Sequence, residues 1–364
     1  MCSFFLLLAP SLWAQAIRVR DDLPYPYHPN RPGALAYAQG GAFVASTGNV
    51  TAMLFNPAGI TPLEGELALT LEGGWNSRTE YLSFFNSDFT SNTQPLQFAG
   101  LAVVPKAKWA VGAYYFRPTD YELDFGEFVT ATPNDPDGAG EVLESVFERR
   151  QYGLGINLAR SMGTNWHLGI GMEWRRAEAR DEVIGALAQG KADAVRLAIG
   201  SIVQVRDWRL GVSLQSQYKA AGEAVFTNGS DFDLEPFKFT TREPASVRAG
   251  FVSPLILKRL RVNGDFEYKD FKAEEAIARR QFYGDATLQL TSFFQLAWGA
   301  FTFRKDYSNF VDGPVSETFL TCGGNLMFGH FNFTASFMEG DLLNQNFEGQ
   351  KFLSLAVGYT LAKK

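Results

Sequence analysis

From about Leu67 to Leu361, apolar residues alternate with small or polar residues in a series of short segments. One segment places Leu154 and Ile156 on one face, and Gly153 and Gly155 on the other. A period of two predicts β-strands, because successive side chains of a strand point to opposite faces. The pattern therefore predicts an all-β body.

The two faces of these strands differ in a way that indicates a membrane barrel. A soluble sandwich also alternates, but its inward face must be apolar, whereas here one face is small and polar throughout. Aromatic residues stand near the ends of the apolar face, as Trp166 with Trp174 and Trp208 with Tyr218 do, which is typical of interfacial girdles. We expect a transmembrane antiparallel β-barrel with a wet lumen; a soluble sandwich or propeller is the alternative.

The number of strands follows from the number of alternating segments. About thirteen are clear, and bacterial single-chain barrels have even numbers, so about fourteen strands are expected. Tyr81 to Phe85 or Ala286 to Leu290 would supply the missing one. Clear segments begin near residues 67, 95, 109, 148, 165, 192, 208, 245, 259, 292, 317, 331 and 351, and long polar loops are expected at about 125–147, 222–244, 274–288 and 340–350.

The first 62 residues lack this alternation. Residues 1–16 combine an apolar run with Ala14-Gln15-Ala16, a small-x-small pattern typical of a cleaved signal peptide; a buried strand or helix is the alternative. Residues 17–62 are rich in proline and glycine and predict an irregular head, followed by the barrel over residues 63–364. Outside the N-terminus no apolar stretch is long enough for a membrane helix, so we expect export to a bacterial outer membrane.

Charge and composition exclude several classes of function. The net charge of -6 and the pI near 5.3 disfavour nucleic-acid binding. His28, His167 and His330 are isolated, so no nucleophile has an evident base, and an enzyme is not expected. No Cys or His cluster has the spacing of metal ligands, and nothing indicates a cofactor. Cys322 would be the lone cysteine of the mature chain.

The head contains a motif in two halves, with Gly40-Gly41-Ala42-Phe43 first and Asn56-Pro57-Ala58-Gly59 second. Pro57 has a fixed φ and restricts Asn56 to extended geometry, so the chain turns here, and Asn56 can bind neighbouring backbone groups. An ordinary turn leading into the first strand is the simpler interpretation. The motif nevertheless resembles the N-terminal signature of the FadL/TodX family of outer-membrane transporters for fatty acids and other hydrophobic compounds, and also that of PorV-type barrels.

The resemblance implies a hatch or plug formed by residues 17–62, with Gly40, Gly41, Asn56, Pro57, Ala58 and Gly59 as its plug or gate residues. In the FadL/TodX family such a hatch blocks the lumen, and ligands reach the membrane through an opening in the wall. The implied function is the gated passage of fatty acids or aromatic hydrocarbons. The PorV-type alternative is a barrel that docks envelope or secreted proteins through loops such as residues 222–244, which contain Phe226, Phe232, Phe237 and Phe239.

Several charged residues share the predicted inward face of their strands. They could line a solute path, or they could pair across strands and hold the head, since a filled lumen must satisfy every charge that it encloses. These residues are Glu173, Arg175, Arg196, Arg206, Arg209, Arg248, Arg261, Asp265 and Glu267.

Overall fold

The computed structural model describes residues 33–61, 63, 65–79, 81–82, 87–88, 93–106, 108–129, 142–183, 186–226, 236–270, 279–305, 315–340 and 349–362. The predicted signal peptide and residues 17–32 of the predicted hatch lie outside these ranges. Among the described residues, no helix is long and apolar enough to span a membrane.

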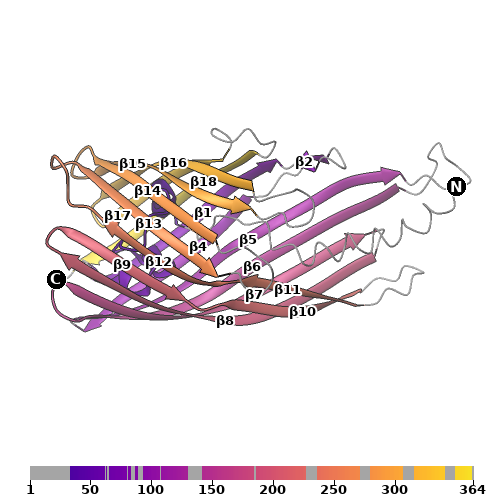
Figure 1. Ribbon diagram of the computed structural model, residues 1–364, viewed down its shortest axis with the longest axis horizontal. Coiled ribbons are helices and arrows are strands. Elements are labelled where there is room, and N and C mark those ends of the chain that lie inside the picture. The colour runs from indigo at the N-terminus through magenta and orange to yellow at the C-terminus, as the bar shows by residue number, and fades with distance from the viewer. Residues whose placement is uncertain are drawn as a thin grey trace, which may run out of the picture.

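A single antiparallel sheet forms most of the structure (Figure 1). Its elements are β1 (Gly65–Thr79), β4 (Thr93–Lys106), β5 (Trp109–Val129), β6 (Val142–Ser161), β7 (Trp166–Val183), β8 (Ala186–Val205), β9 (Trp208–Gln215), β10 (Tyr218–Phe226), β11 (Phe237–Glu243), β12 (Ala245–Val252), β13 (Leu260–Asp270), β14 (Arg279–Gln289), β15 (Phe294–Lys305), β16 (Val315–Phe328), β17 (Phe331–Glu339) and β18 (Gly349–Ala362).

The sheet closes on itself as a barrel of 14 strands. The first strand, β1, pairs with both β4 and the last strand, β18. Sixteen elements make fourteen strands because β9 and β10 are one strand interrupted at Ser216 and Gln217, and β11 and β12 are one strand interrupted at Pro244. The predicted fold class and strand number are confirmed.

The strand that the sequence left ambiguous is β14, which contains Ala286 and pairs with β13 and β15. The expected loop over 274–288 is therefore wrong for most of its length, because Arg279–Gln289 is a strand. Tyr81–Leu82 (β2) instead pairs with Ser87–Asp88 (β3) in a separate two-stranded sheet. Most of the expected loop over 222–244 is also strand, since β10 extends to Phe226 and β11 begins at Phe237.

Side chains of the described strands alternate between the two faces of the wall as predicted, but the alternation breaks where β9 meets β10. Leu154 and Ile156 are 54% and 56% exposed on the outer face, whereas Gly153 and Gly155 are buried on the inner face. Tyr218, expected in an outer girdle, is fully buried instead. The interruption at Ser216 and Gln217 shifts the pairing with β8 by one residue, which reverses the faces of β10 relative to β9.

Residues 33–61, here called the N-terminal segment, pack against the inner face of the wall. The segment contains the short helix α2 (Ala34–Ala38) and two 3-10 helices, η1 (Val50–Leu54) and η2 (Pro57–Ile60). The helix α2 contacts β15 to β18, η1 contacts β1 and β4, and η2 contacts β5 to β8. The segment therefore reaches wall strands from several sides of the barrel.

The two ends of the barrel differ. Short connections lie at one end, such as Arg206-Asp207 between β8 and β9 and Gly329-His330 between β16 and β17. At the other end β5, β6, β7 and β8 project beyond β13 to β17 (Figure 1). Such an asymmetry is typical of barrels with short periplasmic turns and long outer connections.

Candidate functional site: the N-terminal segment and a groove in the wall

The Asn56-Pro57-Ala58-Gly59 motif forms a turn whose polar side chain contacts the wall. Asn56 is fully buried; its Oδ1 accepts from the Ala58 N–H at 3.0 Å and caps η2. Its Nδ2 donates to the carbonyls of Val44 at 2.8 Å, Ser201 at 3.2 Å and Val212 at 3.4 Å. The Asn56 side chain therefore links η2 and Val44 of the segment to β8 and β9 of the wall.

Glycines of the wall make room for this turn. A Cβ at Gly169 would collide with the backbone of Pro57 and Ala58, and one at Gly200 would collide with the Asn56 amide. Gly169 and Gly200 pair directly across β7 and β8, so together they form a flat place on the inner face. The turn lies where the wall has no side chains to exclude it.

The Gly40-Gly41 half of the motif also packs closely against the backbone of the wall, on β14 and β15. Gly40 and Gly41 have φ of 53° and 74°, the left-handed region that favours glycine. A Cβ at Gly40 would collide with the backbone of Gly284 and Ala300. The Gly40 N–H donates to the Thr321 hydroxyl at 3.1 Å.

Buried carboxylates hold the backbone of the segment. Asp265 accepts from the N–H groups of Phe43 at 2.8 Å and Val44 at 3.0 Å, and it pairs with Arg248 at 2.8 Å. Arg248 also donates to the Gly41 carbonyl. On β1, Glu72 accepts from the N–H groups at the start of α2 and from a β18 hydroxyl. Charge-assisted bonds of this kind are stronger than neutral ones, so these residues fix the segment in place.

Tyr37 of α2 lies near Glu72. Burial raises the pKa of Tyr37, and the negative charge of Glu72 raises it further. The Tyr37 hydroxyl therefore stays protonated at physiological pH.

A second buried group of charges lies on β7, β8 and β11. Arg175 pairs with Glu173 and with Glu243, and Arg196 donates to Glu243 at 2.6 Å. Glu173 also accepts from the Tyr114 hydroxyl at 3.0 Å. The structure thus brings Glu173, Arg175 and Arg196 together as a paired network, which includes Glu243 that the sequence interpretation had missed.

The remaining charged residues predicted for the inner face are dispersed. Arg209 donates to the Thr47 hydroxyl, Glu267 accepts from the Tyr283 hydroxyl at 2.8 Å, and Arg261 is partly buried on β13. Arg206 does not face the lumen: it is exposed in the turn between β8 and β9, with φ of 55°. The strand ends one residue before Arg206, which the alternation alone did not indicate.

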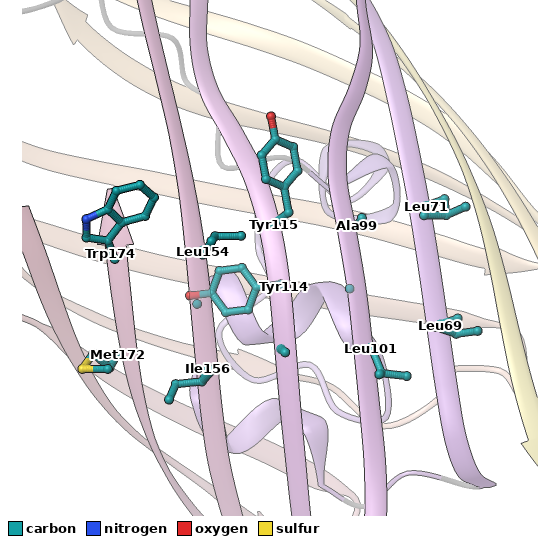
Figure 2. A pocket seen from close by; sticks show the side chains of 13 residues that line it. Leu69, Leu71, Ala99, Leu101, Tyr114, Tyr115, Leu154, Ile156, Met172 and Trp174 are labelled. Carbon is teal, nitrogen blue, oxygen red and sulfur yellow. The ribbon is translucent and has the colours of Figure 1, made fainter. Parts of the chain in front are cut away.

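An apolar groove crosses the outer face of the wall over β1, β4, β5, β6 and β7 (Figure 2). It has a volume of about 470 Å³. The groove is hollow at its centre because the residues there are small, namely Ala99, Gly100, Ala113 and Gly155 on adjacent strands. Larger side chains surround it, namely Leu69, Leu71, Leu101, Tyr115, Leu154, Ile156, Met172 and Trp174.

Beside this groove two strands of the wall part. Pairing between β4 and β5 runs from Lys106–Trp109 to Phe98–Phe116, and beyond that point the described backbone of each strand pairs only with its other neighbour. Pro95 and Pro118 lie just beyond Phe98 and Phe116, and neither has an N–H to donate. We call this parting the β4–β5 fork.

The family resemblance implied an opening in the wall, but sequence interpretation located neither the groove nor the fork, although one signal was present. A proline within a strand removes a ladder hydrogen bond and belongs at an edge or bulge, so Pro95 and Pro118 in neighbouring strands indicate a weak place in the wall.

Among the described residues, no three His, Cys, Asp or Glu side chains lie together as a metal site. Phe232 lies outside the described residues, as do the side chains of Phe237 and Phe239.

These features define a class of protein: a closed antiparallel barrel whose inner face holds its own N-terminal segment and whose wall has an apolar groove beside a parting of strands. No protein-family model and no curated protein sequence matches the chain.

Solved structures do match, and over nearly the whole length. The toluene transporter TbuX of Ralstonia pickettii is 13% identical with a TM-score of 0.68, and the match covers 91% of this chain and 98% of that one. The toluene transporter TodX of Pseudomonas putida is 14% identical, with a TM-score of 0.66 and coverages of 90% and 97%. A FadL homologue of Pseudomonas aeruginosa is 13% identical, with a TM-score of 0.62 and coverages of 90% and 98%. The likeness to FadL/TodX-type barrels inferred from the motif is confirmed for the fold. TodX and TbuX are described as transporters rather than as enzymes.

Proposed function

We propose that the protein is an outer-membrane channel for apolar small molecules, in which the N-terminal segment plugs the lumen and the solute leaves through the wall at the β4–β5 fork. The observation that carries this proposal is the apolar groove on the outer face, which lies directly beside the fork. In a membrane, that groove faces hydrocarbon, where an apolar solute is more stable than in water.

The path on the inner side is also apolar. Val50 and Met53 of the segment belong to one buried cluster with Phe98, Tyr114 and Phe116 of the wall. A solute that descends beside the segment would therefore meet apolar surface next to the fork. The structural neighbours described as toluene transporters support the same class of solute.

Within this proposal, the plug is held by Asn56 and by the close packing at two places, at Gly40 and at the wall glycines Gly169 and Gly200. Gly40, Gly41, Asn56, Pro57, Ala58 and Gly59 all lie in the segment, and it contacts strands around the barrel. A plug fixed on several sides blocks passage straight into the periplasm, so the open route is sideways.

The first test is uptake of radiolabelled toluene by cells that lack other channels for aromatic hydrocarbons. Cells that carry the protein should accumulate toluene several times faster than empty cells. Ala113→Phe fills the groove from the membrane side and should reduce uptake toward that of empty cells, because the exit is then occupied.

The matched control is Ala335→Phe, since Ala335 is also an exposed alanine on the outer face, but on β17. It should leave uptake unchanged. Folded protein in the outer membrane that takes up no more toluene than empty cells, and that co-purifies stoichiometrically with an envelope protein, would replace transport with the docking function.

A further inference from the structure

The inner side of the fork is closed by three aromatic rings that contact one another. The rings of Phe98 and Tyr114 are stacked with centroids 6.2 Å apart, and those of Tyr114 and Phe116 are tilted at 5.8 Å. All three residues are buried, at 0%, 7% and 2% exposure. We call these three residues the ring layer.

The ring layer lies flat against the wall because the wall has glycines there. A Cβ at Gly155 would collide with the Tyr114 ring, one at Gly153 with the Phe116 ring, and one at Gly100 with the Phe98 ring. Gly100 and Gly155 also line the groove on the other face. Tyr114 itself lines the groove, although its ring lies behind the strands in Figure 2, so the ring layer reaches the groove at this place.

The ring layer stands at the fork itself. Phe98 and Phe116 are the last paired residues of β4 and β5, so their rings come from the point at which the two strands part. On the lumen side, η1 of the N-terminal segment packs against the same cluster. A molecule that moves from the segment to the fork must therefore displace at least one ring.

Charged residues hold the rings in place. The Tyr114 hydroxyl donates to Glu173 at 3.0 Å, and the Arg175 guanidinium that pairs with Glu173 lies 4.9 Å from the centroid of the Phe116 ring. A cation over an aromatic face and a hydrogen bond to a carboxylate both restrict ring motion. Glu173 and Arg175 of β7 thus restrict the rings of Tyr114 and Phe116 on β5.

We propose that the ring layer is a shutter over the β4–β5 fork, that Phe116 determines the size of the apolar molecule that passes, and that Tyr114, Glu173 and Arg175 are positioning residues for the closed state. This inference rests on the proposed function, since it assigns selection by size to that same exit. Small monocyclic hydrocarbons need a small displacement of the rings, and bicyclic ones need a large displacement.

The experiment compares uptake of toluene and naphthalene as a ratio. Phe116→Ala should raise the naphthalene-to-toluene ratio by about tenfold, the lower range of discrimination that apolar packing gives for a small difference in size. Tyr114→Phe keeps the ring and loses only the bond to Glu173, so the ratio should rise by less, roughly threefold. Gly153→Ala, which pushes the Phe116 ring from the wall without removing it, should change the ratio in the same direction.

The matched control is Phe319→Ala, because Phe319 is an equally buried inward ring on β16, in a separate cluster. It should leave the ratio unchanged. A wild-type protein that takes up neither compound would refute the proposed function. A wild-type protein that takes up toluene, with a ratio that Phe116→Ala does not change or that Phe319→Ala changes equally, would refute only the shutter.

Discussion

The inner wall has two sides that hold the N-terminal segment by different means. On β4 and β5, the wall offers Phe98, Tyr114 and Phe116 to apolar residues of η1. On β9, β12 and β13, Arg209, Arg248 and Asp265 bind backbone and hydroxyl groups of the segment. The fork and the groove occur on the apolar side.

This difference has a physical consequence. Apolar contacts lack direction, so residues that pack against one another can slide or turn aside without leaving a polar group unsatisfied. Hydrogen bonds to buried charges require fixed geometry, and a break exposes a charge to an apolar environment. The apolar side can therefore rearrange while the polar side keeps the segment in position, as the proposed lateral exit at the fork requires.

The largest effect is expected from Asp265→Ala on the polar side. The substitution leaves the buried Arg248 guanidinium and the N–H groups of Phe43 and Val44 without their acceptor. Breaking a buried pair in this way costs about 3–5 kcal/mol. We expect the segment to loosen and single-channel conductance in planar bilayers to rise.

Asp193→Ala is the control, because Asp193 is exposed and pairs with Arg176 on the outer face. An exposed pair contributes at most about 1 kcal/mol, so conductance should not change. Unchanged conductance in a correctly folded Asp265→Ala barrel would show that the polar side does not retain the segment.

A smaller effect is expected from Asn56→Asp, which keeps the size of the side chain. The amide that donates to the carbonyls of Val44, Ser201 and Val212 is replaced by an oxygen that repels them. A buried polar group that is left without its hydrogen-bond partner costs about 1–3 kcal/mol of stability. Urea unfolding in lipid vesicles should show the reduced free energy of unfolding.

Asn49→Asp is the matched control for that measurement. The Asn49 Oδ1 accepts from the Thr51 N–H at 2.7 Å, and an aspartate accepts the same bond. Its stability should equal that of the wild type. Equal losses in the two variants would mean that the three donated bonds of Asn56 contribute nothing.

The smallest effect is expected from Phe98→Leu on the apolar side. Exchange between large apolar side chains usually costs less than about 1.5 kcal/mol, and no hydrogen bond of the segment is lost. Unfolding should be slightly easier, whereas conductance should remain at the wild-type level. Conductance as high as in Asp265→Ala would refute the distinction between the two sides.

The sequence alone determined properties that repeat along the chain. Alternation placed Leu154 and Ile156 outside and Gly153 and Gly155 inside, because the direction of a side chain in a strand depends only on its position. The motif also located the turn at Asn56-Pro57, since proline restricts its own and the preceding residue wherever it occurs.

Only the tertiary structure decided where the alternation breaks and which distant residues meet. Tyr218 faces inward because β8 pairs with β9 and β10 in registers that differ by one residue, and a register depends on both partners. Asn56 reaches Ser201, 145 positions further along the chain, because barrel closure brings a glycine-lined part of the wall to the segment. The fork depends likewise on β4 and β5 together, since each proline removes one donor from its own strand, whereas the end of pairing at Phe98 and Phe116 involves both strands.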